Sequence, residues 1–349
     1  MPAPDPARST AQRLPKVLLH EHLDGGLRVS TLLELLRQRG LPAPARDAAE
    51  LGQWFEARAH AGSLVEYLRG FGLTLAAMAT PAALERVAFE AAEDAAADGC
   101  VLAEFRIAPL LFEAHRLSGE AALEALLAGL ARAEQALGLP CGLIVCAMRD
   151  HPAAEIARSA ALALRHAGRG VVGFDLAGAE AGHPATAHAA LLRRLVEQGL
   201  ALTLHAGEAD AGQRVLEAVR LGARRIGHGV RLVELLAAPG AEALLAELRQ
   251  RGVHFEVCPT SNVHTGAAAS LARHPIRELW RAGVSLSFHT DNRLMSCTTM
   301  SAEAQGLHDE AGFTWDELRR MGLAAAEATF LPPAARRQAR SALLAWHDD

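Results

Sequence analysis

Residues 16–26 read Lys-Val-Leu-Leu-His-Glu-His-Leu-Asp-Gly-Gly, a short apolar run that ends at two histidines and then at two glycines. The run predicts a β-strand, and side chains two positions apart in a strand share a face, so His20 and His22 can approach one ion together. Imidazole is the commonest metal ligand in proteins. An isolated His-x-His is more often the polar end of a strand, so a metal site here requires further ligands elsewhere in the chain.

Seven further apolar runs follow, separated by segments with the 3.6-residue period of covering helices. They lie at Cys100–Ile107, Gly142–Met148, Val171–Asp175, Leu200–His205, Arg225–His228, Val253–Cys258 and Val284–Asp291. Eight strands alternating with helices in 349 residues, without a Gly-x-Gly-x-x-Gly turn after the first strand, favour a closed parallel barrel over an open dinucleotide-binding sheet. The sequence therefore predicts an α/β fold, a TIM (β/α)8 barrel, with extra helices after the first strand.

Composition narrows the class of protein. Half of the residues are apolar, the net charge is −5, and no block of like charges suggests a nucleic-acid or membrane partner. We expect residues 1–14 to be a disordered leader without a signal peptide or anchor, and residues 15–349 to form one domain. Five cysteines, mostly inside apolar runs, favour reduced thiols and a cytoplasmic protein. The oligomeric state is not readable from the sequence.

Polar residues gather where four of the predicted strands end. The ends read His20-Glu-His22, His205-Ala-Gly-Glu208, Gly227-His228-Gly229 and His289-Thr-Asp291-Asn292. Because barrel enzymes build their sites at the carboxyl ends of the strands, we expect these side chains to meet on one rim. Nitrogen-rich ligation with one carboxylate suits one zinc ion, with iron, cobalt or manganese left open.

Such a site suggests hydrolysis at a carbon bonded to nitrogen. A metal lowers the pKa of a bound water to near 7, and the leaving nitrogen also needs an acid. Glu208, three residues after His205, is placed to be that acid, although it could instead be a first-turn helix carboxylate. His228 lies between two glycines and could orient the nucleophile or stabilise developing charge.

Other chemistries lack their residues. Lys16 is the only lysine and lies at the wrong end of its strand for a Schiff base or a carbamylated-lysine binuclear site. The Pro-Cys-x-x-Cys signature of cytidine-deaminase-type zinc enzymes is also missing, because Pro140-Cys141 has no second cysteine three residues later. Any deamination by this chain therefore uses a different scaffold.

The chain resembles the adenosine deaminase family, a zinc-dependent branch of the amidohydrolase barrels, over nearly its whole length after residue 14. Seven stretches match in the family's order: residues 15–28 (PKVLLHEHLDGGLR), 103–109 (AEFRIAP), 175–180 (DLAGAE), 203–208 (TLHAGE), 225–229 (RIGHG), 255–262 (FEVCPTSN) and 289–292 (HTDN). The resemblance implies a metal-dependent hydrolase barrel and a purine nucleoside as the small-molecule partner.

Carried over by position, the resemblance assigns a role to each rim residue. It implies that one zinc ion per chain is held by His20, His22, His205 and Asp291. It implies that Glu208 protonates purine N1 and that His228 assists the attacking hydroxide. These roles agree with those argued above from the residues alone.

The resemblance also implies contacts to substrate. Asp24 would bind the ribose 5′-hydroxyl, and the backbone N–H of Gly178 would face purine N3. Tyr67, Leu68 and Phe71 match the family's apolar helix over the substrate mouth. Without the resemblance, Asp24 is a turn residue before two glycines and the aromatic pair is helical core packing.

The last rim stretch departs from the family, which commonly has Asn-Thr-Asp-Asp where this chain has His289-Thr290-Asp291-Asn292. An aspartate must be protonated to donate a hydrogen bond to purine N7, whereas the Asn292 amide donates without a proton cost. His289 lies two residues before Asp291, and we expect it to share that face and hydrogen-bond Asp291 rather than bind metal.

The first interpretation is hydrolytic deamination of adenosine or 2′-deoxyadenosine to inosine or deoxyinosine, with release of ammonia. A second keeps the chemistry but changes the substrate to adenine or to a 6-aminopurine nucleoside modified at its 5′ side, such as aminodeoxyfutalosine. Asp24 argues against a free base, which has no 5′-hydroxyl. A third, from another class, is a catalytically silent nucleoside-binding protein.

Overall fold

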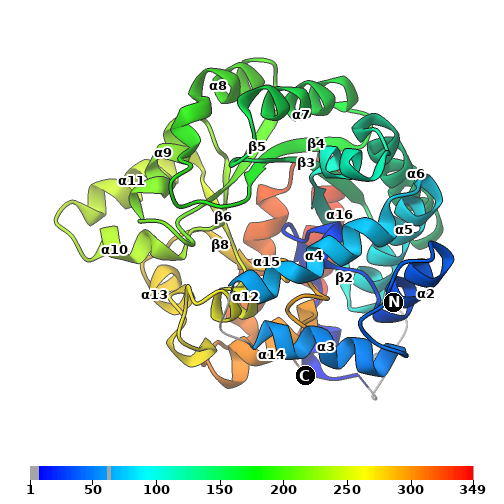
Figure 1. The fold of residues 1–349 in the computed structure, drawn as a ribbon. Helices are drawn as coiled ribbons and strands as arrows, with labels where there is room; N and C mark the ends of the chain where they lie inside the picture. Colours follow the sequence, from blue (N-terminus) through cyan, green and yellow to red (C-terminus); the bar gives the residue numbers. More distant parts are fainter. Residues whose placement is uncertain (1–7, 61–63, 349) are drawn as a thin grey trace.

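The computed structural model describes residues 8–60 and 64–348, without the side chains of residues 64–69. Eight parallel strands run in sequence order around one sheet (Figure 1). The strands are β1 (Lys16–Leu18), β2 (Cys100–Ile107), β3 (Cys141–Met148), β4 (Val171–Ala177), β5 (Ala201–Ala206), β6 (Arg225–His228), β7 (His254–Val257) and β8 (Leu286–Phe288). The predicted (β/α)8 barrel is confirmed.

The barrel closes at the stretch that opened the sequence. Beyond β1 the chain stays extended, so that Glu21 bridges Asp291 on one side and His22 bridges Arg106 on the other. The backbone N–H of His22 donates to the Asp291 carbonyl at 2.7 Å, and the Asp291 N–H donates to the His20 carbonyl at 3.0 Å. The two outermost strands therefore meet at the residues predicted to bind metal.

Helices surround the sheet, and the extra helices expected after the first strand are present. The α-helices are α1 (Thr10–Arg13), α2 (Val29–Gln38), α3 (Ala48–Ala59), α4 (Leu64–Met78), α5 (Pro81–Ala97), α6 (Gly119–Leu137), α7 (Ala153–His166), α8 (Ala189–Glu197), α9 (Gln213–Arg220), α10 (Val233–Leu236), α11 (Ala241–Arg251), α12 (Pro259–His264), α13 (Ile276–Arg281), α14 (Met300–Asp309), α15 (Trp315–Ala328) and α16 (Pro333–Ala345). The 3-10 helices are η1 (Leu23–Gly25), η2 (Pro109–His115), η3 (Ala185–His188), η4 (Val230–Leu232) and η5 (Leu271–Arg273).

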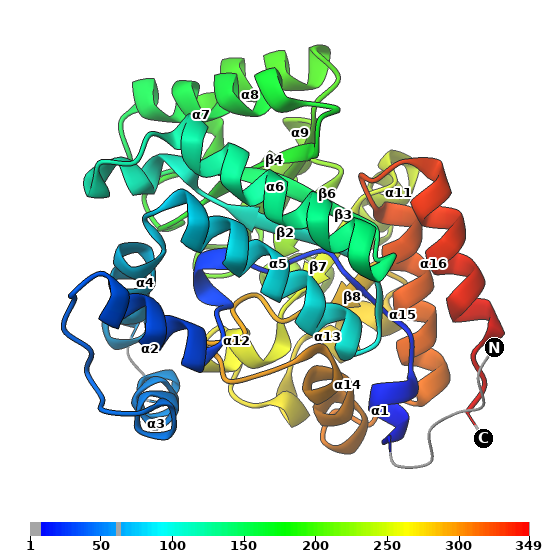
Figure 2. The same cartoon turned by 90° about the vertical axis from the view of Figure 1, so that its right-hand side faces the viewer.

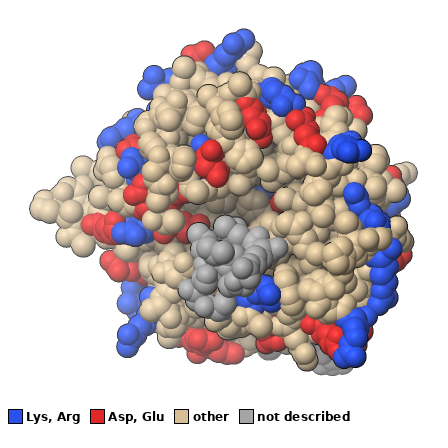
Figure 3. All heavy atoms as spheres, viewed as in Figure 1, with Lys and Arg blue, Asp and Glu red and all other residues tan. Residues whose placement is uncertain are grey.

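The inserted helices cover one end of the barrel. Figure 2 shows α2, α3 and α4 at that end and α1 and α16 at the other. Within this insertion α4 packs against α2, α3 and η1, the turn that follows the two histidines. Figure 3, viewed along the same direction as Figure 1, shows a hollow near the middle of this face. The insertion therefore covers the rim where the strands end.

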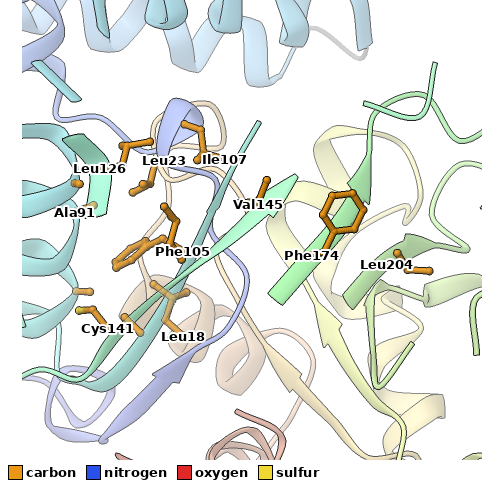
Figure 4. Packing of buried hydrophobic residues seen from close by; sticks show 14 of the residues in the cluster. Leu18, Leu23, Ala91, Phe105, Ile107, Leu126, Cys141, Val145, Phe174 and Leu204 are labelled. Atoms are coloured by element: carbon orange, nitrogen blue, oxygen red, sulfur yellow. The ribbon is translucent and has the colours of Figure 1, made fainter. Parts of the chain in front are cut away.

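Strand β2 illustrates how the core is divided. Its outward residues Phe105 and Ile107 are fully buried among apolar helix side chains such as Leu126 of α6 (Figure 4). The alternate residues Glu104 and Arg106 face the inside of the barrel and are also fully buried. The helix layer is thus apolar while the inside of the barrel carries charge.

The amino-terminal segment differs from the expected disordered leader. Residues 10–13 form α1, with Ser9 as its N-cap, and Ala11 and Leu14 are buried in the core because their apolar side chains pack against the barrel base. Residues 1–7 lie outside the described residues. Across residues 8–60 and 64–348, none of the helices combines the length and apolar composition needed to cross a bilayer.

Candidate active site

Five side chains converge at the carboxyl ends of the strands. A potential metal-binding group consists of His20, His205, His228 and Asp291, each offering one ligand atom within 4.8 Å of the others. His22 joins them, with its Nε2 3.3 Å from Nε2 of His205 and 3.5 Å from Oδ1 of Asp291. The structure therefore brings together all four predicted metal ligands and also His228.

The donor set fits a small metal ion. Nε2 of His20 is buried and has no hydrogen-bond partner within the described part of the chain, and it lies 3.3 Å from Oδ1 of Asp291. Two ligands of a tetrahedral zinc ion, each bonded at about 2.0–2.1 Å, stand about 3.3 Å apart. The distances from His20 to Asp291, from His22 to His205 and from His22 to Asp291 are 3.3, 3.3 and 3.5 Å and match that separation, so these residues fit zinc.

Buried carboxylates orient the imidazoles of His20 and His205. Nδ1 of His20 lies 3.0 Å from Oε2 of Glu256, and Nδ1 of His205 lies 2.9 Å from Oδ2 of Asp175. A carboxylate partner fixes the hydrogen on Nδ1 and leaves the Nε2 lone pair for a metal. Glu256 and Asp175 lie in two of the family-like stretches, but the sequence alone gave no reason to single them out.

A buried arginine joins the two carboxylates. The Arg106 guanidinium donates to Asp175 at 2.8 Å and to Glu256 at 2.6 Å, and all three side chains are fully buried. Burial alone would raise the carboxyl pKa values, but His205 and Arg106 hold the pKa of Asp175 well below the ordinary range, and Arg106 and Arg225 do the same for Glu256. Both carboxylates therefore remain charged acceptors for the histidines.

The backbone bends sharply at two site residues. His228 has φ 61° and Asp291 has φ 58°, in the left-handed region that L-residues seldom occupy. Such strain concentrates at functional sites, where the surrounding structure holds it. Gly227 permits the close approach, because a Cβ there would lie 3.0 Å from Cε1 of His20. The tight spacing of the rim is thus built into the backbone.

Glu208 and His228 form a second pair beside the metal ligands. Oε2 of Glu208 lies 3.5 Å from Nε2 of His228. Its other oxygen accepts hydrogen bonds from Thr265 at 3.1 Å and from the Asn262 amide at 3.3 Å. One carboxylate oxygen is thereby held while the other faces the site. Asn262 and Thr265 were not predicted from sequence, because they lie in and directly after α12, the helix that follows β7, and not at a strand end itself.

The same contacts fix the hydrogen of His228. The backbone N–H of Ile276 donates to Nδ1 of His274, so His274 carries its hydrogen on Nε2 and donates to the Asn262 oxygen at 3.3 Å. Burial lowers the pKa of His274 to about 3, so this ring is neutral. The Asn262 amide then donates to Nδ1 of His228 at 3.0 Å. Neutral His228 must therefore carry its hydrogen on Nε2, toward Glu208.

His289 does not contact Asp291, and that expectation is wrong. Nδ1 of His289 accepts from the backbone N–H of Leu19 at 3.1 Å, and its Nε2 lies 2.7 Å from the Ser287 hydroxyl. Asp291 is instead held by the Ser261 hydroxyl at 2.6 Å. Strand β8 ends at Phe288 and the left-handed backbone at Asp291 breaks the alternation of faces, so residues 289 and 291 do not share a side.

Two predicted substrate residues present unpartnered oxygens at this rim. Asp24, in η1, and Asn292, just after Asp291, are each 5% exposed. Oδ1 of each has no hydrogen-bond partner in residues 8–60 and 64–348. Burial raises the pKa of Asp24 to about 7. Buried polar atoms are normally hydrogen-bonded, so these two suit a bound ligand.

The remaining predicted residues lie around the same end of the barrel. Gly178 follows β4 with φ 88°, a backbone conformation that favours glycine. Phe71, on α4, is partly buried against the main core. The Tyr67 and Leu68 side chains lie outside the described residues. Phe71 is thus consistent with the core-packing alternative, and contact of α4 with substrate stays a prediction.

The chain matches known proteins over almost its full length. The adenosine deaminase family model matches residues 15–346. An adenosine deaminase of Mycolicibacterium gilvum (strain PYR-GCK) is 45% identical over 332 residues, 92% of this chain and 91% of that relative. One from Mycobacterium tuberculosis (strain ATCC 25618 / H37Rv) is 44% identical over 339 residues, 94% of this chain and 92% of that relative. The solved structure of adenine deaminase from Arthrobacter aurescens aligns with TM-score 0.84 at 26% identity, covering 95% of this chain and 99% of that one.

Proposed function

The chain belongs to the adenosine deaminase family, and we propose that it hydrolyses the 6-amino group of adenosine and 2′-deoxyadenosine, giving inosine or deoxyinosine and ammonia. One observation carries the proposal: the predicted metal ligands and the Glu208–His228 pair meet on one rim. A silent binding protein would not need this acid beside a complete ligand set.

His20, His22, His205 and Asp291 would hold one zinc ion per chain. When bound, zinc supplies a Lewis acid that lowers the pKa of water and so provides a nucleophile at neutral pH. Glu256 and Asp175 hold the His20 and His205 rings in the tautomer that leaves Nε2 available. Ser261 donates to Oδ2 of Asp291, and Oδ1 remains directed at the histidines.

Glu208 would give its proton to purine N1 from Oε2. Thr265 and Asn262 donate to Oε1, so the proton that Glu208 gives to the purine would be on Oε2, the oxygen that faces the site. Protonation at N1 makes C6 more electrophilic and so favours addition of water. The His228 hydrogen on Nε2 can be donated to the incoming water oxygen, which orients the attack. In this arrangement Glu208 and His228 would each already carry the hydrogen on the atom that faces the site.

The substrate contacts come from three separate elements. Asp24, whose Oδ1 has no partner within the described residues, would accept a hydrogen bond from the ribose 5′-hydroxyl. The Gly178 N–H would donate to N3, and the Asn292 amide nitrogen would donate to N7. Adenine lacks the ribose, so it cannot use Asp24. The unpartnered Asp24 oxygen therefore favours a nucleoside over a free base.

A substrate panel tests this proposal. The protein is incubated with adenosine, deoxyadenosine, adenine, AMP and aminodeoxyfutalosine, before and after chelation, and the fall in adenine-ring ultraviolet absorbance is followed. We expect the highest kcat/KM for adenosine and deoxyadenosine, with loss of turnover after chelation. Preference for adenine or for a 5′-substituted nucleoside would overturn the proposed substrate, and no turnover of any member of the panel would overturn the proposed reaction.

A cytoplasmic location stays a prediction.

A further inference from the structure

A single buried carboxylate holds the loop that carries Glu208. Glu180, just beyond β4, accepts hydrogen bonds from four successive backbone N–H groups of residues 207–210. Oε1 accepts from residue 207 at 2.5 Å, and Oε2 accepts from residues 208, 209 and 210 at 3.0, 2.9 and 3.0 Å. Glu180 is 6% exposed. Consecutive N–H groups of this kind form an anion-binding concavity, and here the anion is a side chain of the chain itself.

These four N–H groups donate to no other acceptor within residues 8–60 and 64–348. The side chain of Glu208 is held by Thr265 and Asn262, and that of Asp210 by Arg214. The backbone of the loop is otherwise held by the Gly207 carbonyl, which accepts from the Arg231 N–H at 2.9 Å, and by the Gly212 N–H, which donates to Glu234 at 3.0 Å. Both contacts lie at the ends of the loop. The position of the Glu208 backbone therefore depends mainly on Glu180.

Glu180 and the segment before it are held by contacts outside the loop of residues 207–210. The Glu180 carbonyl accepts from His183 at 3.0 Å, and the Ala177 carbonyl accepts from the Arg149 N–H at 2.8 Å. The Arg149 guanidinium crosses from the Leu176 carbonyl to the His205 carbonyl, 2.5 Å from each. Burial lowers the pKa of Arg149, and the opposite charge of Glu180 counteracts that effect. A buried cation thus stands near the buried carboxylate.

We propose that Glu180 is a positioning residue for deamination, which fixes the Glu208 carboxyl at the distance from purine N1 that proton transfer requires. The inference rests on the proposed function, because it takes Glu208 as the acid. A carboxylate is needed because both of its oxygens only accept hydrogen bonds, whereas a glutamine amide would point an N–H donor at one of the four loop donors.

A purely structural tie would affect different quantities. Loss of folded protein lowers activity and bound zinc together, so turnover per bound zinc stays constant. Misplacement of Glu208 lowers kcat per bound zinc and leaves KM nearly unchanged, because Asp24 and Asn292 lie on other elements. The metal ligand His205 is retained by the β5 ladder and by Asp175, so zinc binding should survive.

The test compares E180Q and E180A with E234Q. Glu234 is the matched control because it accepts from the same loop at Gly212, four residues beyond Glu208, and its side chain is 40% exposed. Zinc per chain, kcat and KM for adenosine are measured for each zinc-loaded protein. We expect kcat per bound zinc to fall about 10-fold in E180Q and about 100-fold in E180A, with KM within about threefold, whereas E234Q stays within about twofold of wild type.

Equal kcat per bound zinc in E180Q and E234Q would overturn the positioning role, even if E180Q is less stable. If E180A does not fold, E180Q retains one acceptor oxygen and still decides the question. Wild-type protein that fails to deaminate adenosine would instead overturn the proposed function. The two failures are therefore distinguishable in one set of measurements.

Discussion

This barrel contains two groups of histidines with little or no exposure, and only one of the two is arranged to bind a ligand. His20 and His205 at the rim each give Nδ1 to a carboxylate, which leaves Nε2 free. His254 and His289 form the second group, which we call the lower group. Their ring nitrogens form hydrogen bonds with Ser285, Ser287 and the backbone N–H of Leu19. The partner of the second nitrogen, and not the presence of histidine at a strand end, distinguishes a ligand from a structural residue.

The lower group is a chain of neutral rings. Because Nδ1 of His289 accepts from a backbone N–H, its Nε2 hydrogen goes to Ser287, whose hydroxyl then donates to Nε2 of His254. Burial lowers the pKa of both histidines, that of His254 to about 3. Every nitrogen in this group is used, so no lone pair remains for a metal.

The largest expected difference between the groups is in metal binding and turnover. His205→Ala should lose zinc and reduce adenosine turnover to less than about one-thousandth of wild type, because the metal-supplied nucleophile is lost. His254→Gln should keep one zinc per chain and kcat within about threefold, at a stability cost of about 1–3 kcal/mol. Zinc content, initial rates and thermal unfolding check both variants. Equal zinc loss in the two variants would show that the two groups of histidines do not differ in metal binding.

A smaller effect is expected from the partners of the histidines. Asp175→Asn should weaken zinc binding about 10- to 100-fold, because an amide acceptor makes the His205 ring less basic than a carboxylate does. Ser287→Ala, which removes the shared partner of the lower pair, should leave zinc affinity unchanged. Competition against a chromophoric chelator measures both constants. Weakening by Ser287→Ala to the same extent would contradict the comparison.

The lower group should also show itself in the pH dependence of stability. The pKa of His254 is about 3 in the folded protein, whereas the ordinary value of 6.5 applies to the unfolded chain. Between these two pH values the unfolded chain therefore binds a proton that the folded protein does not bind. Stability must therefore fall as pH drops through this window, by about 2 kcal/mol from this group between pH 7 and 5.

Denaturant unfolding of wild type and His254→Gln at pH 7, 6 and 5 isolates that contribution. The stability advantage of wild type should shrink as the pH falls, because only wild type has to protonate this ring on unfolding. An advantage that stays constant over the range would show that His254 is protonated in the folded protein, and the neutral chain of rings would be wrong.

The smallest expected effect concerns the hydrogen bond that the Asn292 amide would donate to purine N7. Asn292→Leu should raise KM for adenosine about 10-fold, because one hydrogen bond to a buried polar partner is lost. Zinc content and stability should change little, since neither depends on the Asn292 amide. Steady-state kinetics at matched zinc loading provide the measurement. An unchanged kcat/KM would remove Asn292 from the substrate site.

The barrel and most of the rim were predictable from the sequence, and the reasons are local. Each strand is an apolar run, and the carboxyl ends of parallel strands must meet, so His20, His205 and Asp291 had to converge once the barrel was assumed. Glu256 and Asp175 lie inside strands, where a charged residue carries no sign of its partner. Their pairing with imidazoles required the register between strands.

Three features were not predicted correctly, each for a different physical reason. The His289 prediction assumed that strand alternation continues to Asp291, but φ at Asp291 is 58° and the alternation stops. The contacts of Glu180 could not be predicted, because a carboxylate that accepts from four main-chain amides leaves no pattern in side-chain chemistry. The leader prediction failed over residues 10–13, where Ser9 caps a short helix and Ala11 is buried in the core.

A zinc titration of chelated protein shows whether turnover depends on one zinc ion per chain and on Glu208. Adenosine turnover is followed as zinc is returned in steps to the metal-free wild type and, in parallel, to Glu208→Gln. We predict that wild-type activity rises linearly and levels off at one zinc per chain. Glu208→Gln should bind the same single zinc yet turn over adenosine about 10²- to 10⁴-fold more slowly. Full activity without added zinc, or wild-type rates from Glu208→Gln, would contradict a metal-dependent deaminase that uses Glu208 as its acid.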